Sequence, residues 1–489
     1  DGGGPGPAPM SPPRAARPGR LRGDLTRVAP IRRALALPSF QFWAVLPALA
    51  VVVVVLISAA VGLDHPSANF GTVFTWVVWW GGLLVSFVLL GRAWCLVCPI
   101  GAVPEWLQRL SLWWGSRYTA GLNRRWPRGL RTLWLPTALF VVFVFLDNGY
   151  GISNSPRMTA GLIAVIFLGA AWTSLVFERR AFCRYLCPLT AFIGVSALAS
   201  MLELRRRDPG PCRTGCPTKD CFRGNEGHYG CPMAEFPGGG PDSNLHCILC
   251  TECLKSCRRD NIALRLRAPG RDLWAMARPR LDGACAAAVV VGLATVVPLL
   301  TVALLPSLRS LLSRLLPAGV PPNDPPRLAA VALLFAMGLG ATLGLLWGFS
   351  WLSRRAAGGE VATRALFSRV AFALVPIGLS KLVADLLDHT LRTWGALADV
   401  TRALLLDFPW NRVLPERVGT AHLLGPVAVY GLQVALLLGG LLWGLYAMHR
   451  ISRNLFADRT AGFASFLPVA GLALLLTLAS LWTLGIGLL

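Results

Sequence analysis

Long apolar runs are the feature that most limits what this chain of 489 residues can fold into. A helix needs about 20 residues to cross the hydrocarbon core of a bilayer, and lipid leaves any non-helical backbone without hydrogen-bond partners. Only 15% of the residues are charged, against about 25% in soluble proteins. We therefore predict an all-α polytopic membrane protein with about nine transmembrane helices, of which the third is short. The runs are Phe42–Gly62, Thr72–Leu90, Leu133–Leu146, Ala160–Phe177, Ala284–Leu305, Leu328–Leu352, Val370–Leu387, Leu423–Leu445 and Phe466–Leu489.

The net charge of +23 is distributed as in a membrane protein and not as in a nucleic-acid binder. Arginines gather in alternate loops, while the loops Asp64–Asn69 and Asp147–Arg157 carry almost no positive charge. Because loops rich in Lys and Arg stay on the cytoplasmic side, we expect the N-terminus and all cysteine-rich segments there, in the inner membrane of a bacterium. The loops Pro306–Arg327 and Asp388–Arg417 fit this pattern less well. The lipid bilayer, with its anionic headgroups, is the expected partner of this charge, and nucleic acid is not.

Two hairpins of the predicted bundle end in the same cysteine motif. Arg92-Ala93-Trp94-Cys95-Leu96-Val97-Cys98-Pro99 is matched by Arg180-Ala181-Phe182-Cys183-Arg184-Tyr185-Leu186-Cys187-Pro188. The spacing is C-x2-C-P in the first and C-x3-C-P in the second, which indicates an internal repeat. Neither pair alone supplies four thiolates, so we predict that Cys95, Cys98, Cys183 and Cys187 together hold one cluster between the hairpins. A redox-active dithiol in each hairpin is the alternative.

The most specific motif is Cys247-x2-Cys250-x2-Cys253-x3-Cys257. This is the run of bacterial ferredoxins, in which three cysteines bind one [4Fe-4S] cluster and the fourth binds a neighbouring cluster. Arg258 stands where a proline usually follows. A zinc site would favour two separated C-x2-C pairs.

Four further cysteines precede this run with irregular spacing, at Cys212, Cys216, Cys221 and Cys231. By analogy with the crosswise ligation of two-cluster ferredoxins, Cys231 would join Cys247, Cys250 and Cys253, and Cys257 would join the remaining three. A mixed zinc site with His228 or His246 stays open as an alternative, whereas a reducing cytosol disfavours disulfides. The thirteenth cysteine, Cys285, is expected only to pack within a helix.

These motifs resemble the membrane polyferredoxins of the NapH, NosR C-terminal and CcoG type. The resemblance covers about residues 42 to 267 and rests on the paired hairpin motifs followed by the ferredoxin-like segment. It implies two to three [4Fe-4S] clusters, ligation or redox activity at Cys95, Cys98, Cys183 and Cys187, and electron transfer between the quinone pool or a low-potential donor and a partner redox protein. Reduction of a metal such as copper during assembly of a respiratory enzyme is the alternative function, and quinol dehydrogenase activity within a complex stays open.

The C-terminal helices carry a second group of candidate residues. Lys381 and Asp385 are spaced for an ion pair within one helix, His389 follows the end of that helix, and His422 begins the next one. These four side chains could form a quinone site. A haem is disfavoured because both histidines lie at helix ends, where an interfacial histidine is ordinary.

The chain thus divides into four segments. We predict a disordered basic tail (residues 1–39), two repeated hairpins (40–204), a small cytoplasmic ferredoxin-like α+β domain (205–280) and a C-terminal helical domain (281–489).

Overall fold

The computed structural model describes residues 23–113, 120–214, 216–317, 319, 323–415 and 424–486. In this part of the chain, seven helical segments are long and apolar enough to cross a membrane, which confirms a multi-pass membrane protein. The segments are Phe40–Val61, Phe70–Val97, Pro156–Val176, Pro325–Ala356, Thr363–Leu391, Pro426–Leu455 and Arg459–Gly485. The bent pair α14 (Leu281–Ala294) and α15 (Val296–Leu312) makes an eighth candidate. The remaining predicted run, the short third one at Leu133–Leu146, forms α7 (Trp134–Tyr150), whose 17 residues are fewer than the about 20 that a span usually needs.

Two of these helices differ from the sequence-based expectation for identifiable reasons. The run Ala284–Leu305 bends by 43° at Thr295, because Pro298 lacks an N–H and its ring would clash with the carbonyl four residues earlier. The helix predicted to end at Leu387 continues as α18 (Val375–Leu406), so His389 lies within a helix and not after one. Hydropathy marks the apolar part of a helix and not its polar extension.

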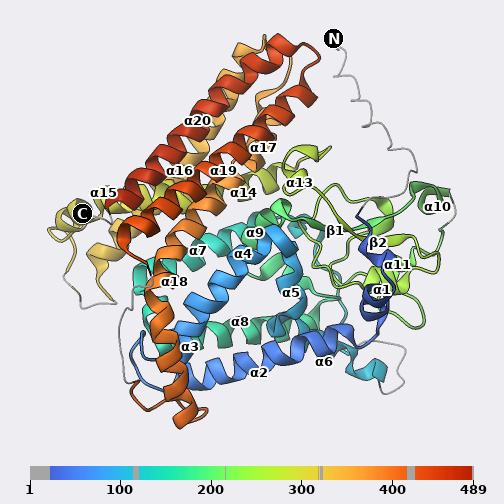
Figure 1. Ribbon diagram of the computed structural model, residues 1–489, viewed down its shortest axis with the longest axis horizontal. Helices are drawn as coiled ribbons and strands as arrows, with labels where there is room; N and C mark the ends of the chain where they lie inside the picture. The colour runs from blue at the N-terminus through green and yellow to red at the C-terminus, as the bar shows by residue number, and fades with distance from the viewer. Residues whose placement is uncertain are drawn as a thin grey trace.

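The N-terminal hairpins are α2 (Phe40–Val61) with α3 (Phe70–Val73), η2 (Phe74–Trp79) and α4 (Trp80–Leu90), then α7 with α8 (Pro156–Val176). Figure 1 shows α16 (Pro325–Ala356), α19 (Pro426–Leu455) and α20 (Arg459–Ile486) as a second group, joined to the first by α18. One buried core runs through both groups. It centres on α9 (Thr190–Ser196), which is buried at every position, and on α14.

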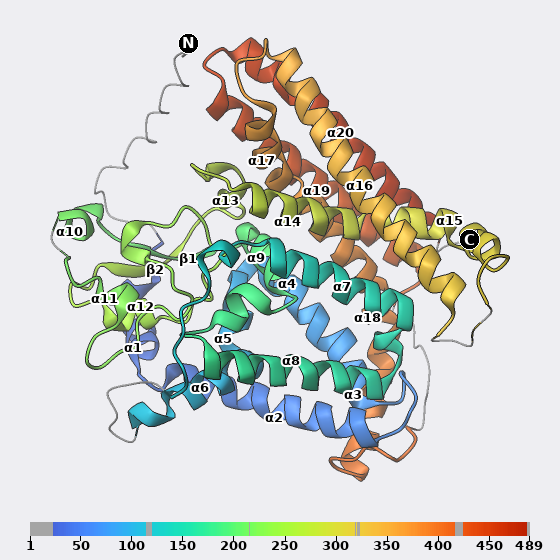
Figure 2. The same ribbon diagram turned by 180° about the vertical axis from the view of Figure 1, so that it is seen from behind.

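A small α+β segment lies at one end of the hairpins, beside the start of α2 (Figure 2). Its two strands, β1 (Leu202–Arg206) and β2 (Ile262–Leu266), pair antiparallel with Leu202 opposite Leu266. Between them lie three short helices, α10 (Pro209–Thr214), α11 (Asp220–Arg223) and α12 (Glu252–Ser256). These helices and the loops around them carry eight of the cysteines.

The predicted disordered tail is partly wrong. Residues 1–22 lie outside the described residues, but 23–39 contain α1 (Ala29–Ala36) and contact the α+β segment. The hydroxyl of Thr251 donates to the carbonyl of Leu35 over 2.9 Å, and Arg32 pairs with Asp260 at 3.0 Å. These long-range partners order a stretch whose local composition favours disorder.

Candidate functional site

The two repeated motifs end their hairpins in the same backbone geometry. Cys98 follows α5 (Trp94–Val97) with φ −68° and ψ 116°, and Cys187 follows η6 (Phe182–Leu186) with φ −58° and ψ 123°. The proline after each cysteine disfavours helical backbone at that cysteine. The segment η6 is a π-helix, in which the N–H of Cys187 bonds the carbonyl of Phe182. Its wider turn accommodates the extra residue of the C-x3-C spacing.

Two equivalent arginines of the repeat connect the hairpins reciprocally. Arg92 of the first motif donates to the carbonyl of Cys183 at 3.3 Å, and Arg180 of the second donates to the carbonyl of Cys95 at 2.9 Å. Both are almost fully buried, with exposed fractions of 1% and 4%. Cys95, Cys98, Cys183 and Cys187, here called the bridging set, therefore lie at one junction. The two arginines were not predicted, although their matching places in the repeat were visible.

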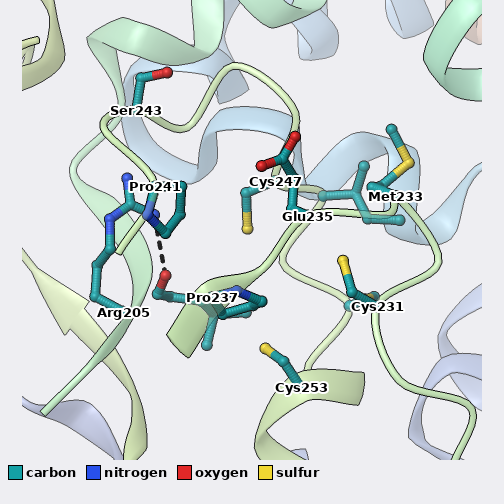
Figure 3. Close-up of a pocket in the computed structure, with 12 residues that line it drawn as sticks. Arg205, Cys231, Met233, Glu235, Pro237, Pro241, Ser243, Cys247 and Cys253 are labelled. Atoms are coloured by element: carbon teal, nitrogen blue, oxygen red, sulfur yellow. Dashed lines mark hydrogen bonds between the residues drawn. The ribbon is translucent and has the colours of Figure 1, made fainter. Parts of the chain in front are cut away.

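Four other cysteines line one narrow cavity of about 30 Å³: Cys231, Cys247, Cys250 and Cys253. We call them the inner set. Figure 3 shows the sulfur atoms of Cys231, Cys247 and Cys253 pointing toward a common centre. These are the four residues that the crosswise pattern of two-cluster ferredoxins groups together.

The remaining four, the outer set, line a wider cavity of about 320 Å³: Cys212, Cys216, Cys221 and Cys257. Asn261 donates hydrogen bonds to two of them. Its side-chain amide donates to the sulfur of Cys212 over 3.2 Å, and its backbone N–H donates to the sulfur of Cys257 over 3.4 Å. Asn261 was not singled out in the sequence, because its contact with Cys212 depends on the fold.

A shared backbone feature surrounds the sulfurs of the bridging and inner sets. In five cases the N–H of the residue two positions after a cysteine donates to its sulfur, namely from Ile100, Leu189, Met233, Leu249 and Glu252. Leu249 and Thr251 adopt positive φ, at 54° and 63°, which turns the ferredoxin run around its cavity. Backbone nests of this kind bind anions and occur at many iron–sulfur sites.

The three sets lie in one row. The bridging set contacts the inner set through a buried cluster in which Leu96, Ile248 and Cys250 pack with Cys95 and Cys183. The inner set contacts the outer set through a second cluster that contains Cys253 and Cys221. The order from the membrane hairpins outward is therefore bridging, inner, outer.

Burial dominates the electrostatics of these thiols. It raises the pKa of Cys98 to about 11, that of Cys187 to about 12 and that of Cys231 to about 11, although the backbone N–H donors oppose the shift. Without a bound cation these groups are neutral thiols at physiological pH. Thiolates at these positions need a strong positive charge beside them, as a metal provides.

The structure also bears on two alternatives to iron–sulfur ligation, namely disulfides and a zinc site that includes a histidine. All thirteen cysteines are free of disulfides. Among the residues that the structure describes, no three Cys, His, Asp or Glu side chains lie close enough to hold a single metal ion. His246 is half-buried, and its removal from water, together with Arg184 and Arg92, lowers its pKa well below 6.5. Its Nδ1 has no hydrogen-bond partner in the described residues. His228 lies in a turn with Asn225.

The predicted quinone residues are partly brought together. Lys381 and Asp385 form an ion pair at 2.5 Å in α18, with Lys381 buried and 43% of the Asp385 side chain exposed. His389 follows one turn later on the same helix and is exposed. His422 lies outside the described residues.

Comparisons with known proteins match the part of the chain that holds the two repeated motifs. Residues 72–117 and 159–207, which include both repeated motifs, match a family model described as a 4Fe-4S binding domain. YccM of Escherichia coli, whose name assigns it to electron transport, is 30% identical over 28% of this chain and 45% of its own length. The methylamine utilization ferredoxin-type protein MauN of Paracoccus denitrificans is 33% identical over 28% of this chain and 53% of its own. An uncharacterized protein of Methanocaldococcus jannaschii is 24% identical over 37% of this chain and 75% of its own.

The chain thus spans about half the length of YccM and MauN. No solved structure matches it.

Proposed function

We infer that this polyferredoxin-like membrane protein, which carries a 4Fe-4S binding domain, passes single electrons through three [4Fe-4S] clusters between the membrane and a partner redox protein. The resemblance to membrane polyferredoxins is confirmed by the family model and by relatives that are named for electron transport and as ferredoxin-type. When bound, each cluster accepts and releases one electron. The protein supplies the thiolates, the hydrogen bonds to sulfur and the exclusion of water that set the potential.

The observation that carries the proposal is the row of three cysteine sets. Each set holds four cysteines, the number that a [4Fe-4S] cluster needs. Neighbouring sets share buried apolar side chains, so electrons would cross packed protein and not solvent. The bridging set lies where the apolar hairpins end, and the outer set lies beside the exposed side chain of Arg258. This order suits transfer between a membrane-bound donor or acceptor and a separate redox protein.

The bridging set has the features of a cluster site. The guanidinium atoms Nε of Arg92 and Nη2 of Arg180 are buried without a hydrogen-bond partner among the described residues. A cluster held by thiolates is anionic and would accept hydrogen bonds from such donors. The raised pKa values of Cys98 and Cys187 count against a reactive dithiol, because the thiolate is the nucleophile in disulfide exchange. Zinc is less suitable at any of the sets, since a tetrahedral zinc site draws its four sulfurs to within about 4 Å of one another and the described residues form no such group.

Iron and sulfide counts combined with electron paramagnetic resonance test this assignment. The anaerobically purified protein should hold about twelve irons and about twelve acid-labile sulfides per chain. Cys98→Ser and Cys187→Ser should each remove the same signal and about four irons, and the double variant should lose no more. Independent losses from the two hairpins, or unchanged iron with loss of zinc, would contradict the bridging cluster.

The three sets are proposed to face the cytoplasm of a bacterium, at the inner membrane. The arginine-rich loops favour that side, and a reducing compartment keeps free cysteines available. A reporter fused after Arg267 should give a cytoplasmic readout. A periplasmic readout would overturn both the topology and the compartment.

We further propose that α18 contributes a quinone site near the bridging set. Gly81 of α4 lies against Leu386 of α18, where a Cβ would be 3.3 Å from the Leu386 side chain. The rings of Trp79 and Trp94 lie 6.0 Å apart, and Trp94 directly precedes Cys95. A quinone bound at Lys381, Asp385 and His389 would thus face the helix that leads to the first motif.

Changing His389 to Leu tests the quinone site. The variant should slow reduction of the clusters by quinol at least about tenfold, as expected for loss of one or more hydrogen bonds in a site, while reduction by dithionite stays normal. His449→Leu, in α19 against Phe466, serves as the matched control. If quinol reduces the clusters at the same rate in both variants and the wild type, these residues do not form a quinone site.

A further inference from the structure

A cavity of about 650 Å³ lies away from the cysteine sets, where three apolar helices begin. It is lined by the first residues of α7 and α14, by residues at the start of α17 (Thr363–Ala373), and by the link that precedes α14. Four arginines line it: Arg278, Arg280, Arg364 and Arg369. The electron-transfer proposal does not use any of them.

The positive charge of this cavity is not balanced by the protein that the structure describes. Asp282 is the acid in the lining, and both of its oxygens are engaged. They accept hydrogen bonds from Arg280 and from the backbone N–H groups of Leu133 and Gly283, at 2.9 to 3.1 Å. Arg278, Arg364 and Arg369 form no ion pair with a described residue. Arg369 is half-buried, and its guanidinium bonds the carbonyl of Ala365 in its own helix.

The position of the cavity relative to the bilayer indicates which anion could balance its positive charge. α7, α14 and α17 are apolar, and α14 and α17 each begin a candidate membrane span at this point. Their first residues therefore lie at the level of the lipid headgroups. Trp134 lines the cavity with half of its surface exposed, which is typical of the aromatic belt at a membrane interface. A lipid headgroup has to lie at this level of the membrane, whereas a free solute does not.

We propose that this cavity binds the phosphate group of an anionic phospholipid. Guanidinium groups bind phosphate oxygens through paired, charge-assisted hydrogen bonds, and basic pockets between membrane helices on the cytoplasmic side bind anionic headgroups. The phosphate would supply the negative charge that Arg278, Arg364 and Arg369 lack. The acyl chains would extend along α7 and α17.

Native mass spectrometry of the complete, cluster-loaded protein tests the proposal. After reconstitution with phosphatidylglycerol and phosphatidylcholine, the wild type should retain one phosphatidylglycerol in preference to phosphatidylcholine. Arg278→Gln should weaken this retention at least tenfold. Arg278 is exposed and forms no hydrogen bond or ion pair with a described residue, so its replacement should not disturb folding. Arg369→Gln, at the half-buried end of the cavity, should weaken it as well.

The matched control is Arg453→Gln, an exposed arginine at the end of α19 that does not line the cavity. It carries the same change of charge and should retain the lipid. Inorganic phosphate at millimolar concentration should not displace the lipid. Equal retention in Arg278→Gln and the wild type, equal retention of phosphatidylcholine, or displacement by inorganic phosphate would each overturn the lipid site.

Discussion

Arg92 and Arg180 occupy equivalent places in the repeat but differ in charge balance. Arg180 forms a buried ion pair with Glu105 at 2.6 Å, and Glu105 also pairs with Arg109. Arg92 is 1% exposed and has no acidic partner among the described residues. A buried and unpaired charge is costly, so Arg92 needs an anion beside it. A cluster in the bridging set would supply that anion, and it becomes more negative by one charge on reduction.

Replacing Arg92 should therefore lower the reduction potential of the proposed bridging cluster. Two charges about 8 Å apart at an effective dielectric constant of about 20 interact by about 2 kcal/mol, which corresponds to about 90 mV for one electron. Arg92→Gln should shift the midpoint by roughly this amount in a potentiometric titration followed by electron paramagnetic resonance. Arg92→Lys should keep most of the wild-type potential, and the exposed Arg354→Gln should keep all of it. An unchanged midpoint in Arg92→Gln would show that this charge does not act on a cluster.

At the scale of elements, the two repeated motifs can hold one cluster between them only if α6 (Pro99–Trp113) lies close to η6. Gly101 makes this approach possible, since a Cβ there would lie 2.8 Å from the sulfur of Cys183. Gly101→Ala should force Cys183 to rotate out of the bridging set and remove about four irons together with one spectroscopic signal. Gly161→Ala in α8 is the matched control, because a Cβ at Gly161 meets nothing within 4 Å. Full iron content in Gly101→Ala would contradict this placement of Cys183.

The same elements show what local sequence could and could not predict. Apolar runs predicted the membrane helices because a bilayer imposes length and composition directly. The analogy with two-cluster ferredoxins predicted which cysteines line the inner and outer cavities, with one cysteine of each run joining the other run. The π-helix before Cys187, the bend at Thr295 and the polar continuation of α18 were not predicted. Contacts such as Asn261 with Cys212, or Arg92 with Cys183, join segments far apart in sequence and depend on the completed fold.

At the scale of the whole molecule, the small α+β segment is attached to the membrane hairpins through the inner set. Arg184, the residue added in the longer motif, pairs with Glu235 at 2.7 Å. Arg92 donates to the carbonyl of Leu245 at 2.7 Å, just before the ferredoxin run. The segment is therefore fixed against the hairpins, with the inner set between the other two sets. In the function proposed above, this order would make a cluster in the inner set the intermediate for electrons that pass from the membrane to the surface.

Removing the inner cluster should thus interrupt electron transfer between the bridging cluster and the outer cluster. In Cys250→Ser, quinol or another membrane donor should still reduce the bridging cluster, because the bridging set keeps all four of its own cysteines. Reduction of the outer cluster by the same donor should slow more than about tenfold, since a single missing ligand abolishes the intermediate site. Dithionite, which reaches the outer cavity directly, should still reduce the outer cluster and so prove that it is assembled. Freeze-quench electron paramagnetic resonance would follow both signals in one experiment. If the outer cluster is reduced through the membrane donor at the wild-type rate, electrons bypass the inner set and the row is not the path.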